Sequence, residues 1–453
     1  MNSKECLTIK EKIALSRAIS SDDIYKAPKG LSYLPFQRVS IKWISLFDKV
    51  LIADPPGAGK TIMIAGAINN EGPRRIFIFA PASLLLNWKK ELTKWLINPL
   101  PVYTWKEWEF LEKKPQEFII LSSFYFAGKK DSILKILKLK SIDLLVVDEV
   151  HAFKDLKAAR TKNLMAKNGP FSISKKVVTM TGTPIVNRPI ELYPLIKRLA
   201  PELILNKNRY EYGMRYCAGW TTPWNTMDFT GASNLKELGM NLRSGFMIRR
   251  EKKDILPQLP KVIKTLIYLD EKTPKSLIFK ADNITDPGAF EFTESSSIRK
   301  ETGLKKLSKA IEYIETQLEG GHEKIILFAH HEEVINGLEA AFAKYDPCKV
   351  VGGMSAKAKD DNVVRFQTDK DARIFIGSLR AAGVGLTLTA ASYVIFVEAD
   401  WTPGINDQAI DRAHRIGQEN IVQADFLVLA NTLDERILSF HFEKAENAAE
   451  LFK

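Results

Sequence analysis

Short apolar runs with almost no polar alternation recur along the chain, and stretches with helical spacing separate them. We expect strands in the first half at 50–53, 75–80, 118–122, 142–147 and 176–181, and in the second half at 324–329, 348–351, 372–377, 393–397 and 424–429. Runs this apolar are typical of strands that are buried on both faces of a parallel sheet. The alternation of strands and helices therefore predicts two α/β domains, each with a parallel sheet.

The chain has 453 residues, which is more than one hydrophobic core usually holds. Residues 201–260 carry several Tyr and Trp side chains among basic residues and show little strand pattern, whereas residues 281–297 have the composition of a flexible loop. We place the crossing from the first lobe to the second between Pro257 and Lys300. The expected parts are an N-terminal extension, a first lobe, a helical protrusion, a linker and a second lobe, at 1–30, 31–200, 201–260, 261–300 and 301–453.

The formal net charge is +12, which suits a polyanionic partner such as nucleic acid, although a basic solvated surface explains the charge equally well. No stretch approaches the roughly 20 apolar residues of a membrane span, so no membrane association is expected. The N-terminus lacks the apolar core of a signal peptide, which predicts a cytoplasmic or nuclear protein. Three scattered cysteines (Cys6, Cys217 and Cys348) suit neither a disulfide framework nor a zinc site.

A glycine-rich segment, Asp-Pro-Pro-Gly-Ala-Gly-Lys-Thr at 54–61, lies between an expected strand and an expected helix. Glycines let backbone N–H groups approach phosphate oxygens at the positive end of a helix. Lys60 would neutralise the β- and γ-phosphates of ATP, and the Thr61 hydroxyl would bind Mg²⁺. Asp54 replaces the first glycine of the general pattern, and a chance match in a loop is the alternative. The residues expected to bind the nucleotide here are Pro56, Gly57, Ala58, Gly59, Lys60, Thr61 and Ile62.

Two adjacent carboxylates, Asp148 and Glu149, directly follow the apolar run at 142–147. Asp148 would hold Mg²⁺ through water, and Glu149 would act as the general base for the attacking water. His151 would relay the state of the nucleotide to the neighbouring motif. An acidic helix N-cap is the alternative, but it accounts for only one of the two carboxylates.

Near the other end of the chain, residues 408–418 contain Arg412 and Arg415, which would share one face if the segment is helical. We expect these arginines to reach the γ-phosphate from the second lobe, so that hydrolysis depends on closure of a cleft between the lobes. An exposed basic helix is the alternative.

Together these motifs resemble the SWI/SNF type of helicase superfamily two, in the order of that family and over roughly residues 31–440. Segment 231–238 is most similar to the annealing-helicase (HepA-related) branch. The other segments that carry the resemblance are 34–37, 80–83 with Trp88 and Glu91, 181–185 with Asn187, 249–254, 378–387, and Glu398 with Trp401 and Pro403.

The resemblance implies two RecA-like lobes with a helical insertion between them, ATP and Mg²⁺ as cofactors, and DNA as the partner. Gln37 would recognise the adenine edge, and Gly385 and Thr387 would lie at the cleft, touching DNA or the nucleotide. Pro55 and Pro56 stand where the family has an acidic residue and a methionine, and catalysis should survive this change. The residues that would contact DNA are Ser83, Trp88, Ser122, Ser123, His330 and Thr387.

We therefore expect a monomeric ATPase that moves along double-stranded or branched DNA. Its work would be to remodel branched DNA, to re-anneal strands or to displace bound proteins. A strand-separating DNA or RNA helicase is the alternative, but it needs a wedge element that the sequence does not identify. A non-hydrolysing ATP-gated DNA clamp is a third interpretation, against which Glu149, Arg412 and Arg415 argue. Recognition domains are not evident, so nucleosome binding is not expected.

Overall fold

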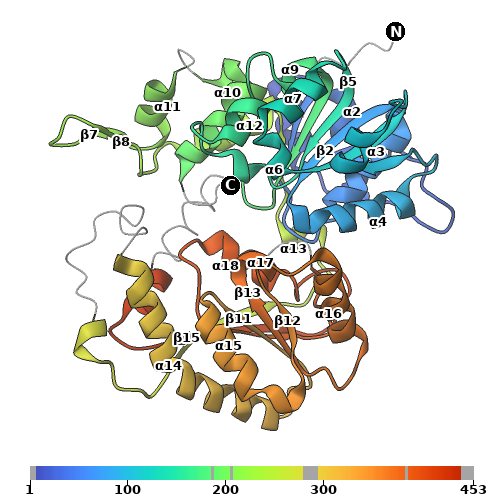
Figure 1. Cartoon of the computed structure of the whole chain (residues 1–453). Coiled ribbons are helices and arrows are strands. Elements are labelled where there is room, and N and C mark those ends of the chain that lie inside the picture. Colours follow the sequence, from blue (N-terminus) through green and yellow to red (C-terminus); the bar gives the residue numbers. More distant parts are fainter. Residues whose placement is uncertain (1–6, 185–187, 205–207, 279–293, 383–385, 440–453) are drawn as a thin grey trace. The chain divides into compact units, whose positions relative to one another are not determined.

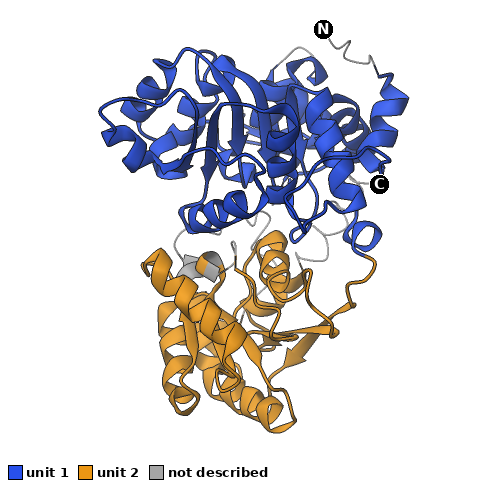
Figure 2. Ribbon diagram, turned by 90° about the vertical axis from the view of Figure 1, so that its right-hand side faces the viewer, with its two compact units in different colours: residues 1–256, 447–453 blue, residues 257–446 orange. Residues whose placement is uncertain are grey.

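The chain divides into two compact units, of which the first extends to Leu256 and the second begins at Pro257 (Figures 1 and 2). They are seen in a computed structural model that describes residues 7–184, 188–204, 208–278, 294–382 and 386–439. Each unit contains its own sheet, and all neighbouring strands in both sheets run parallel. The predicted α/β class with two parallel sheets is confirmed.

The sheet of the first unit has seven strands within the described residues, in the order β3-β4-β2-β5-β6-β1-β9. Its central strands are buried almost throughout, which explains the lack of polar alternation in their sequences. The strand bounds are β1 (Lys49–Ile52), β2 (Arg75–Ala80), β3 (Val102–Thr104), β4 (Phe118–Ser123), β5 (Ile142–Val147), β6 (Ser174–Met180) and β9 (Met247–Ile248).

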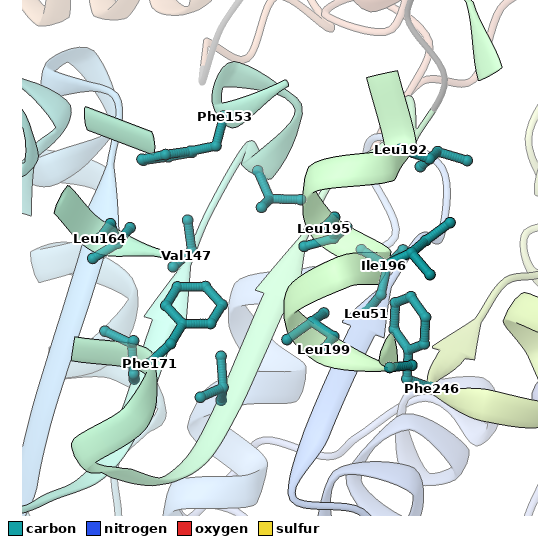
Figure 3. Close-up of a cluster of buried hydrophobic side chains, with 14 of the residues drawn as sticks. Leu51, Val147, Phe153, Leu164, Phe171, Leu192, Leu195, Ile196, Leu199 and Phe246 are labelled. Atoms are coloured by element: carbon teal, nitrogen blue, oxygen red, sulfur yellow. The ribbon is translucent and has the colours of Figure 1, made fainter. Parts of the chain in front are cut away.

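Helices pack against this sheet and bury its apolar side chains. One cluster joins Leu51 of β1 and Val147 of β5 to side chains of the helices and loops that follow them, among them Ile196 and Phe246 (Figure 3). The helices of the first unit are α1 (Ile9–Arg17), α2 (Pro35–Leu46), α3 (Lys60–Glu71), α4 (Leu85–Trp95), α5 (Trp105–Phe110), α6 (Phe124–Ala127), α7 (Lys130–Leu137), α8 (Ala159–Leu164), α9 (Pro170–Ile173), α10 (Tyr193–Leu199), α11 (Arg209–Tyr216), α12 (Leu235–Gly245) and α13 (Lys252–Ile255).

The segment expected to be a helical protrusion, 201–260, is only partly helical. Between α11 and α12 lies an antiparallel hairpin of β7 (Trp220–Thr221) and β8 (Met227–Asp228). After α12 the chain returns to the sheet, where β9 pairs with β1 through Leu51↔Met247 and Ile52↔Ile248. A strand of two residues is too short to show a periodic pattern, so only its pairing partner reveals it.

The sheet of the second unit has six strands within the described residues, in the order β10-β15-β14-β11-β13-β12. Along β11, Ile326 and Phe328 belong to one apolar cluster, and Ile325, Leu327 and Ala329 belong to another. Successive side chains of a strand point to opposite faces, so both faces of this sheet are covered. The bounds are β10 (Val262–Tyr268), β11 (Ile325–Ala329), β12 (Cys348–Val350), β13 (Ile374–Ser378), β14 (Tyr393–Phe396), β15 (Val422–Val428), α14 (Glu294–Glu319), α15 (Glu332–Ala341), α16 (Ala356–Thr368), α17 (Leu379–Ala382) and α18 (Pro403–Ile410).

The expected linker at 261–300 is wrong at both of its ends. Residues 262–268 form β10, which pairs with β15 from Val262↔Val422 to Tyr268↔Val428. This strand lies at the edge of the sheet and exposes Ile263 and Lys264, so it lacks the continuous apolar run of a central strand. At the other end, α14 already begins at Glu294.

None of the helices in the described ranges combines the length and the apolar character that are needed to span a membrane.

Candidate nucleotide-binding site

Three adjacent strands of the first sheet, β5, β6 and β1, run parallel and therefore end at the same edge of the sheet. The glycine-rich loop follows β1, and the carboxylates Asp148 and Glu149 follow β5. The turn at 181–183 follows β6. The fold thus brings the predicted phosphate-binding loop and the predicted carboxylate pair to one edge, although they lie far apart in the sequence.

The loop has a backbone that requires glycine at two positions. Gly57 and Gly59 adopt positive φ angles of 82° and 76°, a region that side chains with a Cβ disfavour. At Gly59 a Cβ would also lie only 2.6 Å from Nε2 of Gln37. Helix α3 starts at Lys60, directly after this turn, and the first N–H groups of a helix have no partner within it. The loop and the start of α3 are therefore suited to bind phosphate.

Lys60 lies close to the loop that precedes it. Its ammonium group donates to the carbonyl oxygen of Asp54 at 2.9 Å and to that of Pro55 at 3.2 Å. These two bonds hold the charge beside the phosphate-binding loop, where phosphate oxygens would be stronger acceptors than carbonyl groups.

A buried ion pair anchors the start of the loop. Both the backbone N–H and Nε of Arg250 donate to Oδ1 of Asp54 at 3.1 Å, and Nη2 pairs with Oδ2. Arg250 also donates to the Phe36 carbonyl at 2.6 Å and to the Ser40 hydroxyl at 2.5 Å, both on α2. Asp54, which stands at the first glycine of the general pattern, is thus the buried partner of Arg250. Sequence analysis missed this role, although the motif at 249–254 belonged to the resemblance.

Two further contacts fix the loop. Nη1 of Arg249 donates to the Ala53 carbonyl at 2.7 Å. On the side of β6, a Cβ on Gly182 would lie 2.7 Å from Cγ of Pro56, so the absence of a side chain there lets the two segments approach closely. The loop is thereby held from both sides by elements that are distant in sequence.

The carboxylate of Asp148 has a fixed orientation. Oδ1 accepts from the backbone N–H of Glu149 at 2.9 Å, and Oδ2 accepts from Nε1 of Trp88 at 3.0 Å. Burial, together with the nearby charge of Glu149, raises the pKa of Asp148 to about 6, although the bond from Trp88 acts in the opposite direction. A bound cation would offset this cost of placing two carboxylates together.

Glu149 has the left-handed backbone conformation, with φ at 45°. This conformation is unfavourable for a residue with a side chain and is often found at functional sites. Oε2 of Glu149 lies 3.2 Å from Nδ1 of His151, which in turn lies 3.0 Å from Oγ1 of Thr181. Oγ1 of Thr181 also accepts from the N–H of Thr183 at 3.0 Å. His151 therefore contacts both Glu149 and the turn after β6, and its role as a relay stays a prediction.

Gln37 contacts the loop rather than open solvent. Its side-chain oxygen accepts from the N–H of Leu34 at 3.0 Å, and its side-chain nitrogen donates to the Ala58 carbonyl at 3.1 Å. Only 2% of the residue is exposed. Its recognition of adenine stays a prediction.

Two of the residues expected to contact DNA are buried, and these two expectations are wrong. Trp88 is 0% exposed because it lies on the apolar face of α4, and its N–H is bonded to Asp148. Ser122 is also 0% exposed, and its hydroxyl is 3.4 Å from the Ser123 carbonyl. Ser83 and Ser123 are half-buried, and their contacts with DNA stay predictions.

Arg412 and Arg415 belong to the second unit, and the helix on which they would share one face does not extend to them. Helix α18 ends at Ile410, and the arginines lie in the turns that follow it. The helical pattern breaks down there, because the N–H of Arg412 bonds the carbonyl three residues back and that of Arg415 bonds the carbonyl two residues back. Gly417, with φ at 100°, completes the change of direction.

Arg415 is held by the segment that precedes Leu388, and Arg412 is held by α18 and by Leu388 itself. Nη1 of Arg415 donates to the Leu386 carbonyl and to Oγ1 of Thr387, each at 2.9 Å. Nε of Arg412 donates to the Gln408 carbonyl at 3.1 Å, and the Arg412 carbonyl accepts from the N–H of Leu388 at 2.9 Å. Thr387 is thus brought together with Arg415. The contact of these arginines with a nucleotide stays a prediction, as does the contact of Thr387 with DNA.

Two further residues of the second unit, His330 and Gly385, were also predicted to contact DNA or the nucleotide. Burial, together with the neighbouring Arg299 and His331, lowers the pKa of His330 to about 4, so its ring is neutral near pH 7. A neutral ring binds phosphate only as a hydrogen-bond donor, and the contact of His330 with DNA stays a prediction. Gly385 lies outside the described residues.

Comparison with known proteins shows which family the chain belongs to. The model of the SNF2-related domain matches residues 36–321, and that of the helicase conserved C-terminal domain matches residues 305–417. A SWI/SNF-related matrix-associated actin-dependent regulator of chromatin subfamily A-like protein 1 from Xenopus tropicalis is 31% identical, over 92% of this chain and 44% of its own length. The DNA annealing helicase and endonuclease ZRANB3 from Mus musculus is 32% identical, over 91% of this chain and 40% of its own length.

The chain thus spans less than half the length of these curated relatives. Among solved structures, the SWI2/SNF2 ATPase core of Sulfolobus solfataricus in complex with double-stranded DNA is 24% identical, with a TM-score of 0.44 and coverage of 94% of each chain. The SNF2-related model covers more than half of the chain, in agreement with the resemblance found in the sequence. The chain belongs to the SNF2-related family.

Proposed function

We propose that the chain hydrolyses ATP and uses the energy to move along double-stranded or branched DNA. The observation that supports this most strongly is the assembly of the phosphate-binding loop, the Asp148–Glu149 pair and the His151–Thr181 contact at one edge of the first sheet. An edge that combines a phosphate site with a carboxylate pair suits phosphoryl transfer.

The residues present fit a nucleotide with Mg²⁺. The loop N–H groups and Lys60 would bind the phosphates. Thr61, in the first turn of α3, and Asp148 supply hard oxygen atoms, and magnesium in such sites takes few protein ligands and completes its shell with phosphates and water. The ion, when bound, neutralises charge on the phosphate oxygens.

The remaining chemistry belongs to the chain itself. Glu149 would accept a proton from the attacking water, with His151 holding its carboxylate. Arg412 and Arg415 would stabilise the charge of the transferred phosphoryl group when the second unit approaches the nucleotide. Hydrolysis would then depend on the arrangement of the two units, which is how an ATPase drives stepwise motion.

Two facts support DNA as the partner. The net charge of +12 favours a polyanion, and a relative that is 32% identical carries the name of a DNA annealing helicase. We propose contacts that are mainly with the phosphate backbone, an intracellular location together with DNA, and action as a monomer. The work would be remodelling of branched DNA, re-annealing of strands or displacement of bound proteins.

An ATPase assay without nucleic acid and with single-stranded, duplex, forked DNA or RNA tests this proposal. We expect a low basal rate and a large rise with duplex or forked DNA. Binding should weaken steeply with salt, because each phosphate contact releases counterions. If no form of DNA raises the rate, the translocase proposal is wrong.

Strand separation is a second candidate because the structure contains a hairpin suited to act as a wedge. At the turn between β7 and β8 the side chain of Trp224 is 83% exposed, and Trp220 in β7 is 53% exposed. An exposed aromatic side chain can stack on an unpaired base. Unwinding of a labelled duplex that is lost in Trp224→Ala, with duplex-stimulated ATPase retained, would favour a helicase over a translocase.

A further inference from the structure

We propose that Trp88 is a positioning residue of the magnesium site, which holds the Asp148 carboxylate in the orientation that receives the ion. This inference rests on the proposed use of Mg²⁺ and ATP, but it does not depend on DNA being the partner.

Each oxygen of Asp148 accepts one hydrogen bond from a group that cannot easily move. One donor is the backbone N–H of Glu149, and the other is Nε1 of Trp88 at 3.0 Å. With a donor on each oxygen the carboxylate cannot rotate freely, and one lone pair on each oxygen is left for the ion or its water. Partners of this kind orient the ligands of a metal and commonly change its affinity 10- to 100-fold.

The indole ring of Trp88 is itself fixed. Trp88, Leu92 and Trp95 are the buried side chains of α4, and Trp88 is 0% exposed. Nδ2 of Asn69, on α3, donates to the Trp95 carbonyl at 2.8 Å, and its Oδ1 accepts from the N–H of Ile97 at 2.9 Å. The end of α4 is thereby tied to α3.

This connection joins both proposed protein ligands of the ion to one pair of helices. Thr61 lies in the first turn of α3, and Asp148 is bonded to α4 through Trp88. The distance between the Thr61 hydroxyl and the Asp148 carboxylate is therefore set partly by the packing of α3 against α4.

The short helical turn Ala82–Leu84 directly precedes α4 and contains Ser83. A ligand that moved this turn would shift Trp88 and, through it, Asp148.

The test is the substitution Trp88→Phe, which keeps an aromatic ring in the core but removes the N–H. Its matched control is Trp105→Phe in the same unit, since Trp105 is 1% exposed and its N–H has no hydrogen-bond partner in the part of the chain that the structure describes. Binding of a fluorescent ATP analogue is titrated with Mg²⁺ in the absence of DNA, and again in excess chelator.

We expect Trp88→Phe to raise the Mg²⁺ concentration for half-maximal binding by about 10-fold. Nucleotide binding in chelator should stay at the wild-type level, and Trp105→Phe should match the wild type in both titrations. A half-maximal concentration in Trp88→Phe equal to that of the wild type would overturn the proposal. An equal loss in chelator, or an equal effect of Trp105→Phe, would also overturn it by showing a general change in packing.

If Trp88→Phe does not fold, β-(3-benzothienyl)alanine incorporated at position 88 gives the same test. This residue has the shape of tryptophan, with sulfur in place of the N–H, so it removes the hydrogen bond without leaving a cavity. The titration uses no DNA, so absence of DNA stimulation in the ATPase assay leaves the inference intact. A wild-type chain that binds no nucleotide at any Mg²⁺ concentration would overturn both proposals.

Discussion

Asp54 and Arg250 form an ion pair whose side chains are 0% and 1% exposed, although they lie 196 positions apart in the chain. Asp54 opens the phosphate-binding loop, whereas Arg250 follows the short edge strand β9. The conformation of the loop thus depends on the segment after β9, which follows all the central strands of the first sheet in the sequence.

Breaking this pair should destabilise the first unit strongly. Arg250→Ala leaves a buried carboxylate without its partner, for which a loss of about 3 to 5 kcal/mol is typical. Asp54→Gly restores the first glycine of the general pattern but leaves the buried Arg250 without its carboxylate partner, so this variant should also lower the stability of the first unit. Urea unfolding measures both losses. Lys135→Ala, which removes a surface pair with Glu109, is the control and should cost less than about 1 kcal/mol.

Glu149→Gln should bind ATP with Mg²⁺ like the wild type and lose turnover by about 100-fold or more, because the amide cannot accept the proton of the attacking water. Lys60→Ala should instead weaken nucleotide binding itself. Equilibrium binding of an ATP analogue and steady-state hydrolysis separate the two effects. Normal turnover in Glu149→Gln would remove this residue from the role of general base.

Arg415→Ala should leave ATP binding largely intact and reduce DNA-stimulated hydrolysis by about 1,000-fold, as expected of an arginine that stabilises the transferred phosphoryl group. The matched variant is Thr387→Val, which removes the hydroxyl bonded to Nη1 of Arg415 but keeps the charge. Its rate should fall far less. Equal losses in the two variants would indicate that Arg415 acts through local structure.

The stability of the second unit should depend on pH through Glu398. Burial by itself would raise the pKa of Glu398. Hydrogen bonds from the ring and backbone of His331 and from the N–H of His330 outweigh burial and lower this pKa from 4.5 to about 2. A lowered acid pKa stabilises the folded state above pH 4.5, and this contribution is lost as the pH falls toward 2. Relative to the wild type, Glu398→Gln should be less stable by up to about 3 kcal/mol at pH 7.

The difference between Glu398→Gln and the wild type should shrink steadily between pH 5 and pH 3. Urea midpoints at pH 7, 5 and 3.5 measure it. A difference that does not change with pH would mean that the Glu398 carboxylate is not preferentially stabilised in the folded state.

The ten strands expected from the sequence are all present, because each has a run of apolar residues that both faces of a parallel sheet can bury. The strands that the sequence did not reveal are β3, β9 and β10, at edges of the two parallel sheets, and the two-residue strands β7 and β8 of the hairpin. An edge strand has one neighbour and can expose polar residues, as β10 does, so its sequence carries no continuous apolar signal.

At the site, local pattern alone located the segments that the fold brings to one edge of the first sheet, but it could not show which partners hold them. The loop with Lys60 and the Asp148–Glu149 pair follow from local pattern alone. The family resemblance implied that Trp88 contacts DNA. The actual partner of its N–H, Asp148, becomes known only once the fold brings the two residues together. Likewise, nothing local shows that the turn after α18, and not a helix, presents Arg412 and Arg415.

The segment between α10 and β9 is a place where members of this family can accept insertions. Between α10 and β9 the chain makes an excursion within the first unit, and β9 pairs with β1, the strand that precedes the phosphate-binding loop, so both ends of the excursion are attached to the same unit. The entropy of closing such an excursion grows only slowly with its length. The hairpin turn at 222–226 is therefore a natural acceptor for inserted modules, by evolution or by protein engineering, at little cost to the fold of the ATPase core.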